Sequence, residues 1–99
     1  MLRAIVLNPA DNVATLLDAG RAGEACELQG EASGHLVLLQ DVPFGHKVCV
    51  ANTSPGTEIL KYGQIIGRAS QPIRAGEHMH VHNIESARAR GDLEKRQAA

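Results

Sequence analysis

Turn-forming residues recur at short intervals along this chain and limit the length of every element that it can form. The turns are Asn8-Pro9, Asp41 to Gly45, Asn52 to Gly56, and Ala75-Gly76. Because proline and glycine interrupt helices and strands alike, the apolar runs between the turns are only a few residues long. Many short strands, and a mostly β fold of the barrel-like or irregular kind, are therefore expected.

The apolar or alternating runs between these turns predict the individual strands. They are Arg3–Leu7, Ala25–Gln29, His35–Gln40, Lys47–Ala51, the two short runs that flank Tyr62-Gly63, and Glu77–Asn83. The run over residues 35–40 is rich in Leu and Val, which is typical of a buried strand.

One early segment predicts a short helix instead. Val13, Leu16 and Leu17 have the i, i+3, i+4 spacing of a helix face. Asp11-Asn12 precedes them as a capping pair, and Gly20 follows as a stop signal. A helix cap is also the simplest role for Asn12.

The length of 99 residues fits a single compact domain. Residues 85–99 are charged and rich in alanine, so they predict a helical tail with few apolar anchors. We expect the domain itself to span residues 1–84, with no internal repeat.

The charge balance argues against a partner made of nucleic acid. Lys and Arg number 10, Asp and Glu number 11, and the formal net charge is −1, so no basic field attracts a phosphate backbone. One Phe, one Tyr and no Trp leave almost no surface on which bases could stack. A core made only of small aliphatic side chains is limited in size, so association with a partner, a homo-oligomer included, is expected.

The chain also lacks the marks of a membrane or secreted protein. No apolar run approaches the ~20 residues of a membrane helix. The run from Leu2 to Leu7 is too short for a signal peptide. Cys26 and Cys49 are too few for a disulfide scaffold and lie among apolar or small neighbours, which predicts buried free thiols. We expect a cytoplasmic protein without a membrane partner.

The histidines are the most suggestive side chains. His78, His80 and His82 are two residues apart, so an extended backbone projects all three on one side. Neutral imidazole is a common ligand of iron, zinc, copper and nickel. The alternative is a solvent-exposed histidine face, opposite Met79 and Val81 in the core.

Two further tripeptides place cations beside glycine. Gly45-His46-Lys47 and Lys61-Tyr62-Gly63 suit an anionic small molecule, because glycine lets a ligand approach the backbone and lysine attracts a carboxylate. The alternatives are an exposed pair beside a turn and a structural turn with a packed tyrosine. Asn83 either orients a ligand or caps the tail.

Four motifs, taken in order, resemble one known family. They are Asn8 to Ala14, Gly45 to Val48, Ile59 to Gly67, and Gly76 to Asn83. Together they are similar to the SAF-type N-terminal module of the altronate/galactarate dehydratase family, and to the small subunit of sulfolactate sulfo-lyase. The resemblance covers the chain up to about Ile84.

The resemblance implies a β-clip fold of the SAF or antifreeze-like kind. It implies a lyase: the small subunit of a metal-dependent hydro-lyase that dehydrates a sugar acid such as altronate or galactarate, or eliminates sulfite from sulfolactate. The implied partner is a separate large catalytic subunit, and the implied cofactor is Fe2+, sometimes replaced by Mn2+, shared with that subunit. The alternative is a non-catalytic SAF-type module that binds a sugar acid or a protein. An antifreeze-like surface protein is a weaker third reading, which the many charged and histidine residues disfavour.

The resemblance also implies the site residues. His80 and His82 would be catalytic and would ligate the metal. The side chains that would bind or enclose the substrate are Asn12, His46, Lys47, Tyr62 and Asn83. His78 falls at a position that varies in the family, so it is left out of the site.

Overall fold

The computed structural model describes residues 2–86, which form short β-strands and no helix. One sheet contains β1 (Leu2–Val6), β2 (Val13–Leu16), β3 (Ala25–Gly30), β4 (Gly34–Val37), β5 (Lys47–Cys49) and β8 (His78–Met79). A second sheet contains β6 (Glu58–Lys61), β7 (Gln64–Ala69) and β9 (Ile84–Ser86).

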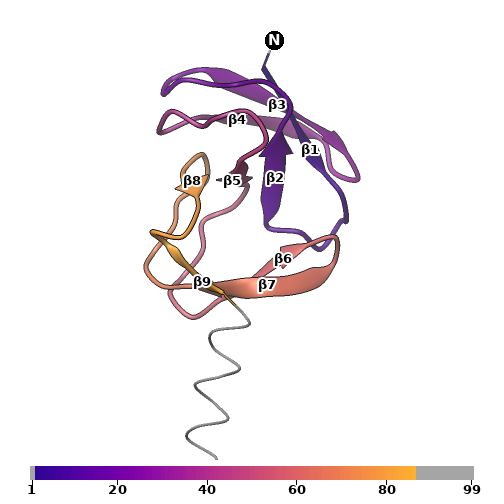
Figure 1. The fold of residues 1–99 in the computed structure, drawn as a ribbon. Helices are drawn as coiled ribbons and strands as arrows, with labels where there is room; N and C mark the ends of the chain where they lie inside the picture. The colour runs from indigo at the N-terminus through magenta and orange to yellow at the C-terminus, as the bar shows by residue number, and fades with distance from the viewer. Residues whose placement is uncertain (1, 87–99) are drawn as a thin grey trace, which may run out of the picture.

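The strand order is β4-β3-β1-β2-β5-β8 in the large sheet and β6-β7-β9 in the small one, and the large sheet curls around above the small one (Figure 1). The pairs are antiparallel except for β1 and β3, which run parallel. The prediction of a mostly β fold is confirmed. Across residues 2–86, no helix has the length and apolar character needed to cross a membrane.

Two apolar clusters fill the domain, and β2 and β5 contribute to both. Ala14, Leu16 and Val48 belong to the larger cluster, whereas Val13 and Cys49 belong to the smaller one. Because side chains along a strand alternate between its faces, a strand between two cores is apolar on both sides. Both cysteines are buried and free, as predicted.

The predicted early helix is wrong, because residues 13–16 form β2. Val13 and Leu16 are both apolar because they lie in a strand that is buried on both faces, and not because they share one face of a helix. Asp11 and Asn12 do not cap local backbone groups, since their side chains accept hydrogen bonds from the distant β6–β7 hairpin.

The predicted buried strand over residues 35–40 also needs correction. β4 ends at Val37 and lies at the edge of the sheet, where β3 is its one strand neighbour. Val37 is 54% exposed, while the buried residue of this run is Leu38, beyond the strand. A Leu/Val-rich run does not reveal which of its faces the rest of the fold will cover.

The last predicted strand, Glu77–Asn83, is shorter than expected. Only β8 is extended, and the chain turns at residues 80–83, where the Asn83 amide donates to the His80 carbonyl at 3.0 Å. Residues 85 and 86 belong to β9, and the rest of the predicted helical tail lies outside the described residues.

One local unit occurs four times, so the expectation of no repeat is wrong at this scale. In each unit a glycine with φ between 78° and 93° precedes a residue whose amide donates to the carbonyl three residues earlier. The donors are Glu24, His46, Thr57 and Glu77, and a strand follows each of them within two residues. The sequence Arg-Ala-Gly-Glu at 21–24 and 74–77 is the visible trace of this repeat.

Asp11 anchors the small sheet through its carboxylate. The side chain is buried, and its two oxygens accept hydrogen bonds from the amides of Tyr62 and Gly63 at 2.9 and 2.8 Å. Tyr62 has φ 57°, the one non-glycine residue with positive φ in the described chain. These bonds hold the tight β6–β7 turn in a conformation that an L-residue rarely adopts.

Asn12 makes a second connection beside the first. Its side-chain amide donates to the Glu58 carbonyl at 2.9 Å and accepts from the Leu60 amide at 2.7 Å. Its own carbonyl accepts from the Val50 amide at 3.1 Å. One residue therefore ties β6 to the segment that follows β5.

Replacing Asp11 tests this anchor. Asp11→Ala removes two charge-assisted hydrogen bonds and leaves the turn amides without their partner, so we expect the free energy of unfolding to fall by about 2–4 kcal/mol. The measurement is urea denaturation followed by circular dichroism. Asp18→Ala breaks only an exposed ion pair with Arg3 and should cost less than about 1 kcal/mol. Equal losses in the two variants would contradict the anchoring role.

Candidate functional site

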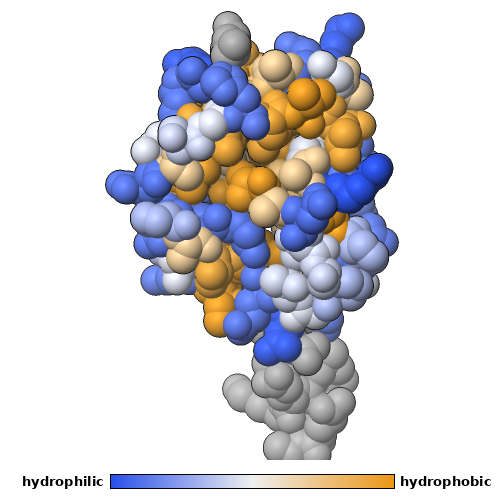
Figure 2. Space-filling model, turned by 180° about the vertical axis from the view of Figure 1, so that it is seen from behind, coloured by the Kyte–Doolittle hydropathy of each residue, from blue (hydrophilic) through white to orange (hydrophobic). Residues whose placement is uncertain are grey.

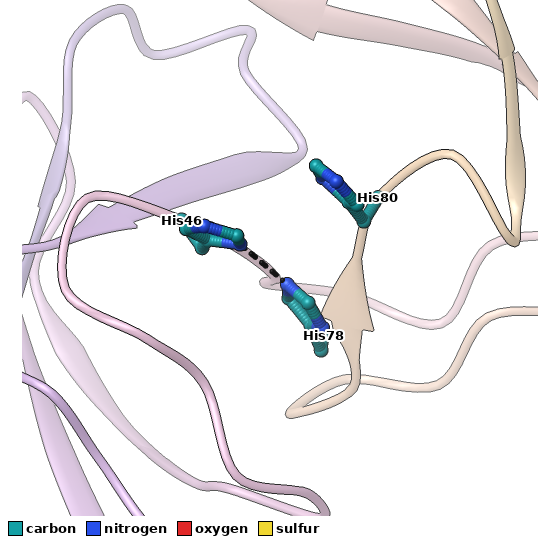
Figure 3. A group of neighbouring side chains, drawn as sticks. All are labelled: His46, His78 and His80. Atoms are coloured by element: carbon teal, nitrogen blue, oxygen red, sulfur yellow. Dashed lines mark hydrogen bonds between the residues drawn. The ribbon is translucent and has the colours of Figure 1, made fainter.

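Three histidine side chains converge at one end of the large sheet. His46 precedes β5, His78 lies in β8, and His80 directly follows β8, and their imidazoles point into one shared space (Figure 3). The Nδ1 atom of His46 is 2.9 Å from the Nε2 atom of His78. Ring centroids are 5.1 Å apart for His46 and His80, and 5.6 Å apart for His78 and His80. One ring nitrogen of each residue lies within 4.8 Å of the other two.

The pairing of β5 with β8 brings these residues together. Val48 lies opposite His78 in the antiparallel register, which places the residue before β5 beside the end of β8. His46 also occupies the last position of a repeated turn unit. In two other units this position holds Glu24 or Glu77, whose carboxylate accepts a hydrogen bond from its own turn. In the unit that ends at His46, the histidine side chain faces β8 instead.

The Asn83 side chain fixes the backbone of the histidine segment by hydrogen bonds. It is fully buried, and its amide donates to the His78 carbonyl and accepts from the His80 amide, both at 2.9 Å. Its polar atoms are thus engaged by the backbone, which makes it a positioning residue here. His82 lies at the border of the cluster, with its ring centroid 5.6 Å from that of His78.

Burial lowers the pKa of His78 below its ordinary value, and the nearby cationic or titratable groups lower it further. These are His46, His82, His80 and Lys47, in decreasing order of effect. A lowered pKa keeps this imidazole neutral near pH 7. A neutral ring offers the lone pair that a metal ion needs.

The three imidazoles fit a divalent transition metal. Two nitrogens that share one metal at about 2.1 Å are roughly 3.0–3.4 Å apart, depending on the geometry. The His46–His78 separation of 2.9 Å is already close to that value, whereas the His80 nitrogen lies within 4.8 Å of the other two and would have to move closer. Imidazole donors suit iron, zinc, copper and nickel. Three protein ligands leave further coordination positions for a substrate.

Two cavities flank the cluster. The first, about 460 Å³, reaches His78 and is lined by one cationic residue, Arg21, and two acidic residues, Glu24 and Asp41. The second, about 380 Å³, reaches His80 and carries Lys47 and Lys61. The second cavity is therefore the cationic one.

Burial lowers the pKa of Lys47, and the like charge of Lys61 lowers it further. The Lys61 ammonium also lies 5.5 Å from the centre of the exposed Tyr62 ring. Lys47 thus lines a cavity, as a substrate-binding residue would. The amide of Asn12 is engaged by β6 and positions that strand.

The site residues that the resemblance implies leave out His78 and Lys61, although the sequence offered Lys61-Tyr62-Gly63 as a possible anion site. The equal spacing of His78 and His80 was the available signal for the first, and the adjacency of Lys61 to Tyr62 for the second. The resemblance implies one site that contains both His46 and His80, but the contact of His46 with His78, 32 positions along the chain, is visible only in the fold.

The fold and the site define a small β module in which an imidazole cluster lies beside a cationic cavity. The family model for the altronate/galactarate dehydratase SAF domain matches residues 2–87. The chain belongs to this family of SAF domains, as its motifs predicted.

Named relatives agree with this assignment. The chain is 35% identical over 82 residues to altronate dehydratase of Bacillus subtilis, which covers 83% of this chain and 16% of the relative. It is 34% identical over 85 residues to altronate dehydratase of Escherichia coli, covering 86% of this chain and 17% of the relative. It is 43% identical over 47 residues to (2R)-sulfolactate sulfo-lyase subunit alpha of Chromohalobacter salexigens, covering 48% of this chain and 50% of the relative. The chain thus spans about a sixth of the dehydratases and half of this subunit.

The histidine cluster predicts a pH-dependent stability in metal-free protein. The folded pKa of His78 is lowered, so the unfolded state binds more protons below the ordinary histidine pKa of about 6.5. The contribution of His78 to the free energy of unfolding is therefore fully present above that pH. It is lost as the pH falls towards the pKa of His78 in the folded state. Chemical denaturation at a series of pH values measures this slope. His78→Gln should reduce the slope, and an unchanged slope in this variant would contradict the assignment.

Proposed function

We propose that this chain is the SAF-type component of a metal-dependent lyase. The reaction would remove water from a sugar acid of the altronate or galactarate type, or sulfite from sulfolactate, together with a larger catalytic part. The observation that carries the proposal is the three-histidine cluster within a domain of this family. We take the curled double-sheet arrangement to be the β-clip that the resemblance implies.

The chemistry of such a reaction matches the residues at the site. Fe2+ or Mn2+ bound by His46, His78 and His80 would stabilise the negative charge that develops when the proton next to a carboxylate leaves. His82, whose ring centroid is 5.6 Å from that of His78, would take or return a proton. Lys47 lines the cationic cavity and would attract the substrate carboxylate, whereas Tyr62 is exposed and is not among the residues that line this cavity.

The exposure of the site supports the need for a larger partner. Phe44, two residues before His46, is 69% exposed, and Val81, beside His80, is 82% exposed. Apolar surface also gathers over the large-sheet half of the face seen in Figure 2. Because elimination chemistry benefits from a site that excludes water, we propose that a larger catalytic part covers this region, either as a separate subunit or within a longer chain.

The alternative is a module that binds a sugar acid and performs no chemistry. It is favoured by one observation: the aligned region is only 16% of the length of the altronate dehydratase of Bacillus subtilis. In that case the residues that react would lie elsewhere, and the cluster would serve recognition.

Metal titration tests the cluster without any enzymatic assay. The chain should bind one equivalent of Co2+, with visible absorption bands of a nitrogen-ligated ion. Because loss of even an outer partner of a metal ligand costs about 10–100-fold in affinity, His78→Ala and His80→Ala should each weaken binding at least tenfold. His35→Ala is the matched control and should bind as the unaltered chain does. A chain that binds no Co2+, or equal losses in all three variants, would refute the metal assignment.

A reconstituted reaction tests the lyase proposal. The chain is co-expressed with a larger catalytic part of the same family, and altronate, galactarate and sulfolactate are assayed with Fe2+. We expect turnover of one of these acids, and a decrease in kcat of about 100-fold or more in His80→Ala, since positioned proton transfer and charge stabilisation supply at least that factor. No turnover by a folded complex, together with sugar-acid binding by the chain alone, would favour the binding module.

A further inference from the structure

The second cavity contains a pair of cations that come from different sheets. Lys47 belongs to β5 of the large sheet, and Lys61 ends β6 of the small sheet, yet both line the same space of about 380 Å³. This size lies at the lower end of the range for small-molecule pockets. Two like charges at one cavity repel each other, and an anion between them would relieve that repulsion.

The fold holds these two lysines in place through backbone contacts. Asn12 binds the Glu58 carbonyl and the Leu60 amide of β6, and its own carbonyl accepts from the Val50 amide just beyond β5. The position of β6 relative to β5 is therefore set by these backbone contacts and does not depend on the lysine side chains. The two cations face one cavity because the scaffold places them there, which is the arrangement of a preorganised binding site.

The rest of the cavity wall strengthens an electrostatic interaction. Its apolar side chains are Ile66, Val81 and Ile84. Ile66 and Ile84 are half-buried, whereas Val81 is 82% exposed, so the two isoleucines are the neighbours that reduce the local dielectric and strengthen the attraction of a charge pair there. The first cavity offers no such field, because Glu24 and Asp41 accompany its arginine.

His80 connects this cavity to the histidine cluster. It lines the cavity, and its ring stacks on that of His46 with centroids 5.1 Å apart. An anionic group between the lysines would therefore sit beside the imidazoles, with the neighbouring carbon atoms of the same molecule within their reach.

We infer that Lys61 acts with Lys47 as a two-cation subsite for the acidic group, carboxylate or sulfonate, of a small hydroxy acid whose hydroxyl-bearing carbons extend toward His80. This inference rests on the proposed function and deepens it, because it assigns one end of the substrate to a particular cavity. It makes Lys61 a specificity-determining residue that selects acids over neutral polyols.

Titration of the chain with defined probes tests the inference. Galactarate, altronate and sulfolactate are each added at low ionic strength, with galactitol as the uncharged control, and binding is followed by calorimetry with and without one equivalent of Mn2+. At least one acid should bind and galactitol should not. Affinity should fall as salt is added, because both cations act through charge.

Variants separate the subsite from the metal cluster. Lys61→Met keeps most of the aliphatic stem and should weaken acid binding by about tenfold, as loss of a charge-assisted contact does. Lys61→Gln is measured beside it, so that a folding defect in one variant does not decide the result. Arg3→Met, which removes an equal charge from β1, is the control and should bind the acid normally.

The outcomes distinguish this inference from the lyase proposal. Weaker acid binding with unchanged Co2+ binding in both Lys61 variants supports the subsite. Unchanged acid affinity in the Lys61 variants, equal loss in Arg3→Met, or no acid binding by the unaltered chain overturns it. Failure of Co2+ binding alone would refute the metal cluster and leave the anion subsite standing.

Discussion

The hydrogen bonds of Asp11 and Asn12 to the β6–β7 hairpin hold together the parts from which the site is built. A buried carboxylate satisfies two turn amides, and a side-chain amide satisfies a carbonyl and an amide of β6. These groups would otherwise compete with water for partners, so each bond also avoids the cost of an unpaired polar group. The small sheet is thereby fixed against the large one, and Lys61 is brought to the cavity that Lys47 lines.

The site combines neutral donors and fixed charges within a few ångströms. Burial and mutual repulsion keep the pKa of His78 low, which favours the uncharged imidazole. The adjoining cavity keeps two cationic side chains. In the function proposed here, neutral nitrogens would bind a metal cation and ammonium groups would attract an acid anion, so the two halves would select opposite charges. A hydroxy acid that coordinates a metal is complementary to such a pair of neighbouring sites.

Predictions from the sequence were correct where the signal is local and wrong where it depends on distant parts of the chain. Glycine and proline turns predicted a mostly β chain correctly, because their backbone preferences act within four residues. The spacing of Val13 and Leu16 predicted a helix wrongly, because a strand between two cores shows the same apolar positions. Asp11 and Asn12 suited a helix cap for the same reason: the sequence shows their hydrogen-bonding capacity but not the hairpin that uses it.

The sequence by itself determined the short strands, the buried thiols, the family and the residue types at the site. Only the tertiary structure decided which histidines meet. An extended strand would have aligned His78, His80 and His82, but the backbone turns after β8, and the pairing of β5 with β8 brings His46 to the cluster instead. The physical reason is that strand pairing and hairpin anchoring act between residues far apart in the chain, where local periodicity carries no information.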